Sequence, residues 1–173
     1  MTGPDAGSSD APNRLSPVRL DELWDFDDPR RSEQRFRTEL SDASPAGTCR
    51  AELETQLARA IGLQGRIDDA SAVLDAVEAA GDPAPVVRIR LLLERGRLRN
   101  AAGDRAGSVE YFGAALTVAE SAGEDFLAVD AARMLAIVDP AWSQAWTDRA
   151  LEIAADSSDP RTRRLLGPDG AAG

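Results

Sequence analysis

The 173-residue sequence contains no histidine and a single cysteine, Cys49. Without histidine the chain can form no Ser-His-Asp or Cys-His catalytic pair and no histidine-based zinc site. One thiol cannot form an internal disulfide, which fits a reducing compartment. Because Cys49 lies in a polar stretch with no imidazole to activate it, a spectator thiol is favoured over a reactive one. We therefore expect no metal ion and no other cofactor.

A long apolar run is also absent. No uninterrupted apolar stretch approaches the roughly 18 residues that a membrane span needs, and the first residues have neither the basic start nor the apolar core of a signal peptide. Thirty acidic residues against twenty basic ones give a net charge of −10, which repels phosphate backbones. We expect a cytoplasmic protein that binds neither membranes nor nucleic acids.

Aromatic residues are few, at 5%, whereas hydrophobic residues make up 43% and are mostly alanine and leucine. Small side chains let helix axes approach one another, so this composition favours packed helices over sheets. No alternating strand pattern is present. Gly, Pro, Ser and Asp dominate residues 1–16, which predicts a disordered tail. The helical domain is expected over residues 17–156, and residues 157–173 are expected to hold a short helical start and a second tail.

Prolines and acids mark the predicted helix starts. Asp28-Pro29 opens one helix, and Asp139-Pro140 is predicted to open another, with Pro140 at the first helical position, where its missing N–H costs nothing. Both dipeptides belong to the same pattern, Asp-Pro-x-x-Ser. Because the same pattern stands near both ends of the domain, it indicates that the two helices it opens are equivalent.

Small side chains recur at a near-constant interval. If the turn inside each helix pair is placed at residues 27, 65, 103 and 138, the turns are 38, 38 and 35 residues apart. Five positions after each turn stand the small residues Ser32, Ala70, Ser108 and Ser143. Seven positions before each turn stand Leu20, Ala58, Gly96 and Ala131, which are mostly small. Nine positions after the first three turns stand the bulky residues Phe36, Leu74 and Phe112, whereas Thr147 breaks this series at the fourth turn. Two helices approach to about 8–10 Å only where small residues face each other, and one pair cannot bury its apolar face alone, so the pairs must stack.

Two segments, TQLARAIGLQGRIDDASAVLDAVE and LLLERGRLRNAAGDRAGSVEYFGAAL, resemble tetratricopeptide repeats, and LDELWDFDDPRRSEQRF resembles the start of bacterial repeat proteins of this class. The resemblance covers about residues 17–156. It implies an all-α fold, a right-handed superhelical solenoid of about four antiparallel helix pairs. Arg95 and Arg99 depart from the pattern by replacing a bulky residue in the first helix of the third pair. Because family members usually continue into further repeats, the chain is interpreted as a shortened member or a fragment.

In such repeats the first helix of each pair lines a concave groove that binds a protein or peptide. By the resemblance, the groove-facing candidates are Arg59, Arg90, Arg97 and Asn100. Guanidinium groups suit carboxylates, so we expect an acidic peptide or a chain terminus as the ligand. Replacing Arg90 and Arg97 with glutamate is then expected to weaken partner binding without unfolding the protein. In the alternative, these arginines are solvated or pair with acids of neighbouring repeats, such as Glu52, Glu94 or Asp130.

Trp142 and Trp146 lie four residues apart and are expected on one face of the last long helix. Core packing is the usual role of such a pair. If nothing caps the last helix pair, the two indoles instead form an association surface, and the protein is a structural unit that self-associates into a homo-oligomer. No glycine-rich nucleotide loop is present, and the acidic residues fit helix starts or exposed faces. We expect a binding scaffold and not an enzyme.

Overall fold

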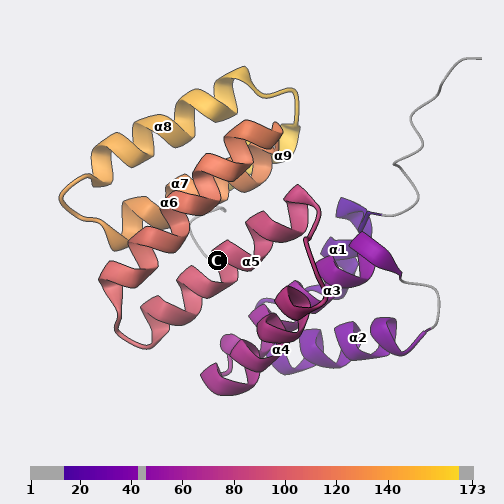
Figure 1. Ribbon diagram of the computed structural model, residues 1–173. Coiled ribbons are helices and arrows are strands. Elements are labelled where there is room, and N and C mark those ends of the chain that lie inside the picture. Colours follow the sequence, from indigo (N-terminus) through magenta and orange to yellow (C-terminus); the bar gives the residue numbers. More distant parts are fainter. Residues whose placement is uncertain (1–13, 43–45, 168–173) are drawn as a thin grey trace, which may run out of the picture.

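The computed structural model describes residues 14–42 and 46–167. Within these ranges the chain forms nine α-helices and no strand, so the all-α class predicted from the sequence is confirmed. In chain order the helices are α1 (Pro17–Leu23), α2 (Pro29–Ser41), α3 (Gly47–Gly62), α4 (Ile67–Ala79), α5 (Pro85–Ala101), α6 (Arg105–Ala122), α7 (Asp125–Val138), α8 (Ser143–Asp156) and α9 (Pro160–Leu166) (Figure 1). The tails predicted at the two ends lie outside the described residues except for 14–16 and the stretch that contains α9. Leu15, near the end of the first predicted tail, is buried.

Side-chain caps begin four of these helices. Ser16, Asp28, Asp104 and Asp159 each accept a backbone N–H from the first turn of α1, α2, α6 and α9, respectively. Such a cap satisfies one of the amide groups that have no partner inside the helix. Gly123 ends α6 in the left-handed region, at φ 68°, which glycine adopts without steric cost. Local sequence chemistry therefore accounts for where these helices start and stop.

Helix α8 begins later than the sequence predicts. The expected start at Pro140 is wrong, because a short turn occupies that position and the helix begins at Ser143. Asp139 does not cap the start of α8 but follows the last residue of α7, where its backbone N–H donates to the carbonyl of Leu135. Its carbonyl accepts the backbone N–H of Trp142 at 3.1 Å, and its carboxylate accepts the indole N–H of Trp146, also at 3.1 Å. The same Asp-Pro-x-x-Ser pattern does open α2, with proline in its first turn.

Consecutive helices pack as hairpins, α3 against α4, α5 against α6 and α7 against α8. The first helices of successive pairs also contact one another, α3 with α5 and α5 with α7, and α9 packs against both α7 and α8. Figure 1 shows the resulting stack, which extends from α2 at one end to α8 at the other. In a helical repeat each pair contacts its neighbours in this way, so the architecture is consistent with one.

The positions that recur in the sequence are buried in the first three pairs, except for Leu20, which is half-buried. The buried positions are Ser32, Ala70 and Ser108; Ala58 and Gly96; and Phe36, Leu74 and Phe112. The fourth pair differs from the other three. Thr147, which breaks the series of bulky residues, is exposed, and Ser143 is only half-buried. Small and bulky side chains therefore meet inside the stack at the interval that the sequence shows.

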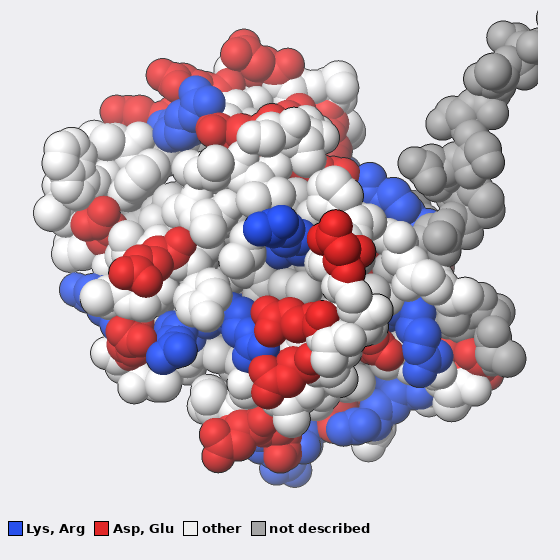
Figure 2. All heavy atoms as spheres, viewed as in Figure 1, with Lys and Arg blue, Asp and Glu red and all other residues white. Residues whose placement is uncertain are grey.

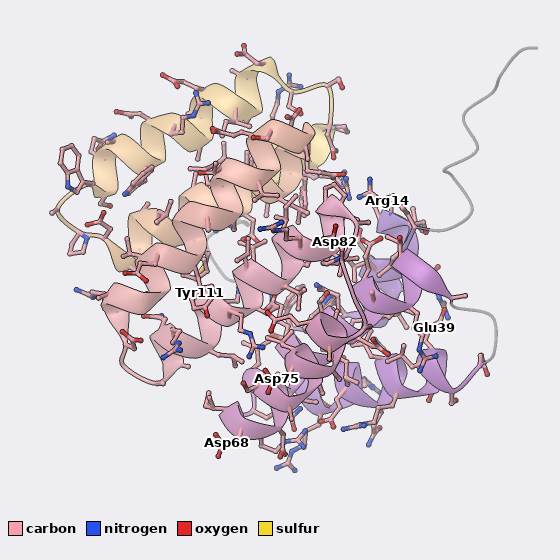
Figure 3. The ribbon with its side chains drawn as sticks, viewed as in Figure 1. Arg14, Glu39, Asp68, Asp75, Asp82 and Tyr111 are labelled. Carbon is pink, nitrogen blue, oxygen red and sulfur yellow. The ribbon has the colours of Figure 1, made fainter. Side chains whose placement is uncertain are left out.

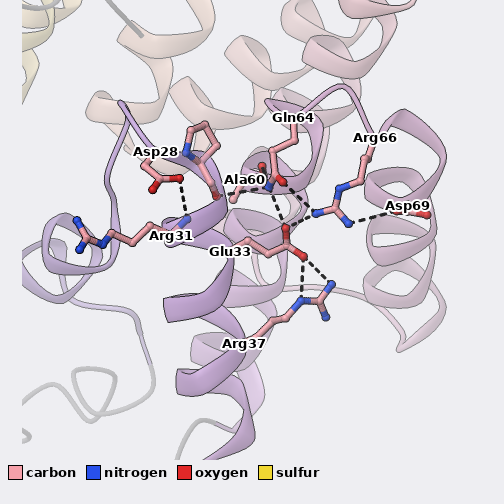
Figure 4. Close-up of polar contacts among 9 residues, drawn as sticks. Asp28, Arg31, Glu33, Arg37, Ala60, Gln64, Arg66 and Asp69 are labelled. Atoms are coloured by element: carbon pink, nitrogen blue, oxygen red, sulfur yellow. Dashed lines mark hydrogen bonds and ion pairs between the residues drawn. The ribbon is translucent and has the colours of Figure 1, made fainter.

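Polar contacts join the first two pairs at their outer edge (Figure 4). Glu33 on α2 accepts hydrogen bonds from Gln64 at 2.8 Å and from Arg37 at 3.0 Å, and it also forms an ion pair with Arg66. Burial by itself would raise the pKa of the Glu33 carboxyl, but these hydrogen bonds and the nearby guanidinium charges outweigh it and hold the pKa below its ordinary value. The Glu33 carboxylate is thus a stabilising link between α2 and the turn that joins α3 to α4.

Arg95 links the second and third pairs. It extends from α5 to α4, where it donates a hydrogen bond to Ser71 at 2.8 Å. It also pairs with Asp75 at 2.5 Å and with Glu78 at 2.8 Å (Asp75 is labelled in Figure 3). The contact that Arg95 makes between these two pairs is therefore polar.

Acidic and basic side chains are interspersed over the face seen in Figure 2, without a broad region of one sign. None of the helices in the described ranges combines the length and the apolar character that crossing a membrane requires. The expected cellular compartment stays a prediction.

Candidate binding groove

One pocket takes its lining from the first helix of every pair and from α9. It encloses about 310 Å³ between α1, α3, α5, α7 and α9 and the connection that follows α1. Its apolar lining includes Trp24, Leu93, Leu127 and Leu165, and its polar lining includes Gln56. Because these side chains come from the chain's whole length, the pocket exists only when the pairs are stacked. We call it the groove pocket.

Arg59 lies in the groove pocket without a hydrogen-bond or ion-pair partner among the described residues, and its Nε is buried. The guanidinium lies over two aromatic rings, 5.3 Å from the ring centroid of Trp24 and 5.5 Å from that of Phe26. Those rings stack on each other at 4.7 Å, and the indole N–H of Trp24 donates to Gln56 at 3.1 Å. Cation–π contacts hold the guanidinium in place but leave its N–H donors unused.

Arg90 and Arg97 are engaged in ion pairs, which is the alternative that the sequence left open. Arg90 donates to Glu52 at 3.1 Å, and the Glu52 side chain is only 1% exposed. Arg97 donates to Glu94 at 2.6 Å and to Asp130 at 2.6 Å, so it joins α5 to α7. These contacts form two ion-paired groups, Arg90 with Glu52 and Arg97 with Glu94 and Asp130, and Arg90, Glu94 and Asp130 also line the groove pocket.

Burial and neighbouring charges act in opposite directions on the carboxylates of Glu94 and Asp130. Burial raises the pKa of the Glu94 carboxyl, and the charges of Arg97 and Arg59 offset that rise only in part. For Asp130 burial would also raise the pKa, but the same two arginines outweigh it and hold the pKa below its ordinary value. Burial, together with the charge of Arg97, lowers the pKa of the Arg59 guanidinium. Arg59 is therefore a desolvated cation whose neighbouring carboxylates hydrogen-bond to another arginine.

The four groove candidates named from the sequence are only partly brought together. Arg59 and Arg90 line the groove pocket, whereas Arg97 is not part of the lining but pairs with two lining residues, Glu94 and Asp130. Asn100 is exposed near the end of α5, outside the pocket. The charge reversals considered for Arg90 and Arg97 would leave buried carboxylates facing new carboxylates, so they would test folding and not binding.

Sequence reasoning did not single out the side of the pocket that α7 supplies. Phe126, Asp130 and Arg133 all line it, and they are spaced four and three residues apart. This spacing places them on one face of a helix. The pattern could have been recognised, but which face of α7 points to the groove depends on how the pairs stack.

Segments from the two ends of the described chain are held against α3 and the start of α7. Before α1, Arg14 forms two hydrogen bonds with Glu124, at 2.8 and 3.2 Å, and the backbone N–H of Leu15 donates to Glu52 at 3.2 Å (Arg14 is labelled in Figure 3). At the other end, Ser157 donates to Asp125 at 2.7 Å and ties the start of α9 to the start of α7. Of these two end segments, α9 also contributes to the groove pocket, through Leu165.

The two C-terminal tryptophans have different surroundings. Trp142 precedes α8 and is 65% exposed, whereas Trp146 is half-buried and hydrogen-bonded to Asp139. Helix α9 packs against both α7 and α8. Besides Trp142, the last pair exposes the large apolar side chains Ile137 and Leu151. The association surface stays a prediction.

A scan against models of known protein families finds no match to this chain, and a search among curated proteins finds none either.

Proposed function

We propose that the chain is a tetratricopeptide-repeat-like protein of bacterial type, a right-handed superhelical stack that binds a protein or peptide in its groove. The observation that supports this most is the groove pocket, which collects side chains from α1, α3, α5, α7 and α9. A surface built from every first helix is what stacked repeats produce, and repeat proteins use such concave surfaces to bind partners. The protein is a binding scaffold and not an enzyme.

The chemistry of the pocket supports a partner segment with one carboxylate. Arg59 offers guanidinium donors that no described residue uses, and guanidinium groups bind carboxylates with two parallel hydrogen bonds. Glu94 and Asp130 also line the pocket and would repel further negative charge. A chain terminus or an isolated acidic side chain therefore fits better than a run of acids.

Blocking the groove tests this proposal. Peptides would be selected from a random displayed library on the immobilised protein. Their binding would then be measured after a bulky maleimide is attached at Asp21→Cys, on the rim of the pocket, in a Cys49→Ser background. The matched control carries the same label at Glu110→Cys, an exposed position on α6 outside the groove pocket. We expect loss of binding only with the label at position 21. Equal binding by both labelled proteins would exclude the groove as the binding surface.

Self-association through Trp142 is the second candidate, because a tryptophan that is 65% exposed is unusual on a monomer and aromatic residues are enriched at interfaces. Sedimentation velocity over a wide concentration range tests it. Association that disappears in Trp142→Ser would support an oligomerising unit. A protein that stays monomeric at every concentration would rule this candidate out.

A further inference from the structure

The groove pocket has the dimensions of a small-molecule site. Its volume of about 310 Å³ lies at the lower end of the range, roughly 300–1,000 Å³, in which proteins bind small ligands. Helix α9 contributes Leu165 to its lining. A pocket of this size can hold a compact molecule or one side chain of a partner.

The pocket combines apolar walls with charged groups, the carboxylates of Asp21, Glu94 and Asp130 and the guanidinium groups of Arg59, Arg90 and Arg133. Leu93, Leu127 and Leu165 supply an apolar wall, and Trp24 with Phe126 adds aromatic faces. Small-molecule sites commonly combine such walls with few polar groups that fix the ligand's orientation. A ligand matched to this lining has an apolar body.

The guanidinium N–H groups of Arg59 donate to no described residue, so a negatively charged ligand group would match them. Arg90 and Arg97 already hydrogen-bond to Glu52, Glu94 and Asp130, but Arg59 donates to no described residue. A buried donor without a partner costs free energy, and an acceptor brought by a ligand removes that cost. One guanidinium can take one carboxylate in the bidentate geometry. A second negative charge would lie near the carboxylates of Asp21, Glu94 and Asp130, and the other two arginines of the lining, Arg90 and Arg133, already have partners.

We propose that the groove pocket binds a small monocarboxylic acid, whose carboxylate lies on Arg59 and whose apolar body packs between α5, α7 and α9. The inference does not depend on protein binding, although a partner segment inserted in the groove would compete with the acid for Arg59. The lowered pKa of the Arg59 guanidinium, caused by burial and the charge of Arg97, agrees with a site that gains from a bound anion.

Three eight-carbon probes separate the contributions of charge and apolar surface. Octanoate carries one carboxylate, octanamide is its neutral counterpart, and octanedioate carries a carboxylate at each end. Binding is read from the fluorescence of Trp24 in a Trp142→Phe/Trp146→Phe chain, in which Trp24 is the only one of the three tryptophans that remains. Calorimetry on the unchanged chain repeats the measurement, so the result does not depend on how that variant folds.

We expect saturable binding of octanoate and binding of octanamide and octanedioate weaker by about tenfold or more, because a charge-assisted pair is lost in one case and a second charge is desolvated in the other. Arg59→Met should abolish the preference for octanoate over octanamide, whereas Arg59→Lys should keep part of it. Arg99→Met, which removes an exposed arginine outside the groove pocket, should change nothing.

Equal binding of octanoate and octanamide, tighter binding of octanedioate, or a preference that survives Arg59→Met would each overturn the inference. Failure of all three probes to bind would overturn it as well. The protein-binding proposal is judged separately, by the peptides that the library selects. Peptides that bind and are blocked by the label at position 21, with no binding of octanoate, would leave protein binding in place and remove the small-acid site alone.

Discussion

Gly96 on α5 lies directly against the ring of Phe112 on α6. A Cβ atom at Gly96 would lie 2.6 Å from Cε1 of that ring, well inside van der Waals contact, and Phe112 is fully buried. The missing side chain of one helix therefore makes room for the bulky side chain of the other. This contact sets how closely the two helices of the third pair approach.

Replacing Gly96 with alanine is expected to reduce the free energy of unfolding by about 1–3 kcal/mol, the usual cost of overpacking a core. Gly113→Ala on α6 is the matched control, because a Cβ at Gly113 meets nothing within 4 Å. That change should raise stability by roughly 0.5–1 kcal/mol through the better helix propensity of alanine. Urea unfolding measures both, and destabilisation of the same size in the two variants would contradict the packing argument.

Arg97 and Arg59 should differ in their effect on stability. Arg97→Met leaves the carboxylates of Glu94 and Asp130 without their arginine, which is expected to cost about 3–5 kcal/mol. Arg59→Met removes a desolvated cation that has only ring contacts, so the free energy of unfolding should change by less than about 1 kcal/mol. Thermal and urea unfolding of the two variants test this. A large loss from Arg59→Met would mean that the guanidinium has a structural partner.

Glu33 should make stability fall in acid. Its pKa in the folded protein lies below the ordinary value of 4.5, so its contribution is complete above pH 4.5 and is lost as the pH falls through the folded pKa. At pH 7, Glu33→Gln is expected to cost about 1.5–3 kcal/mol, because hydrogen bonds to a charged group are lost. The difference from the unchanged chain should shrink below pH 4.5. A difference that stays constant from pH 7 to pH 3 in urea unfolding would show that the carboxylate charge contributes nothing.

Mutations of Trp142 and Trp146 should also differ in their effect on the free energy of unfolding. Trp142→Ser changes an exposed side chain and is expected to alter stability by less than about 0.5 kcal/mol. Trp146→Phe loses the hydrogen bond to Asp139 and should cost about 1 kcal/mol. Unfolding of the two variants compares them. If Trp142→Ser proved the more destabilising change, Trp142 would have to be packed rather than exposed.

Helix boundaries and the small and bulky positions were readable from the sequence because they depend on neighbours close along the chain. Caps act within one turn, so Asp28 and Asp104 identify the helices that follow them. The recurrence of small residues predicts Gly96 and Ala70 as buried contact points, which they are. Asp139 is the exception, because its carboxylate accepts the indole N–H of Trp146, seven residues further along the chain, and does not cap the start of α8.

The sequence by itself determined that the chain is helical, where α2 begins, and that the small and bulky positions of the second and third pairs are buried, because these properties follow from local capping and from the period of small and apolar residues. Only the tertiary structure decided which arginines are used internally. Arg90 and Arg97 find carboxylates 38 and 33 residues away, whereas Arg59, on the neighbouring first helix, finds none among the described residues. Charge pairing between helices depends on the rotation and offset of each pair against the next, and a local pattern does not contain those two quantities.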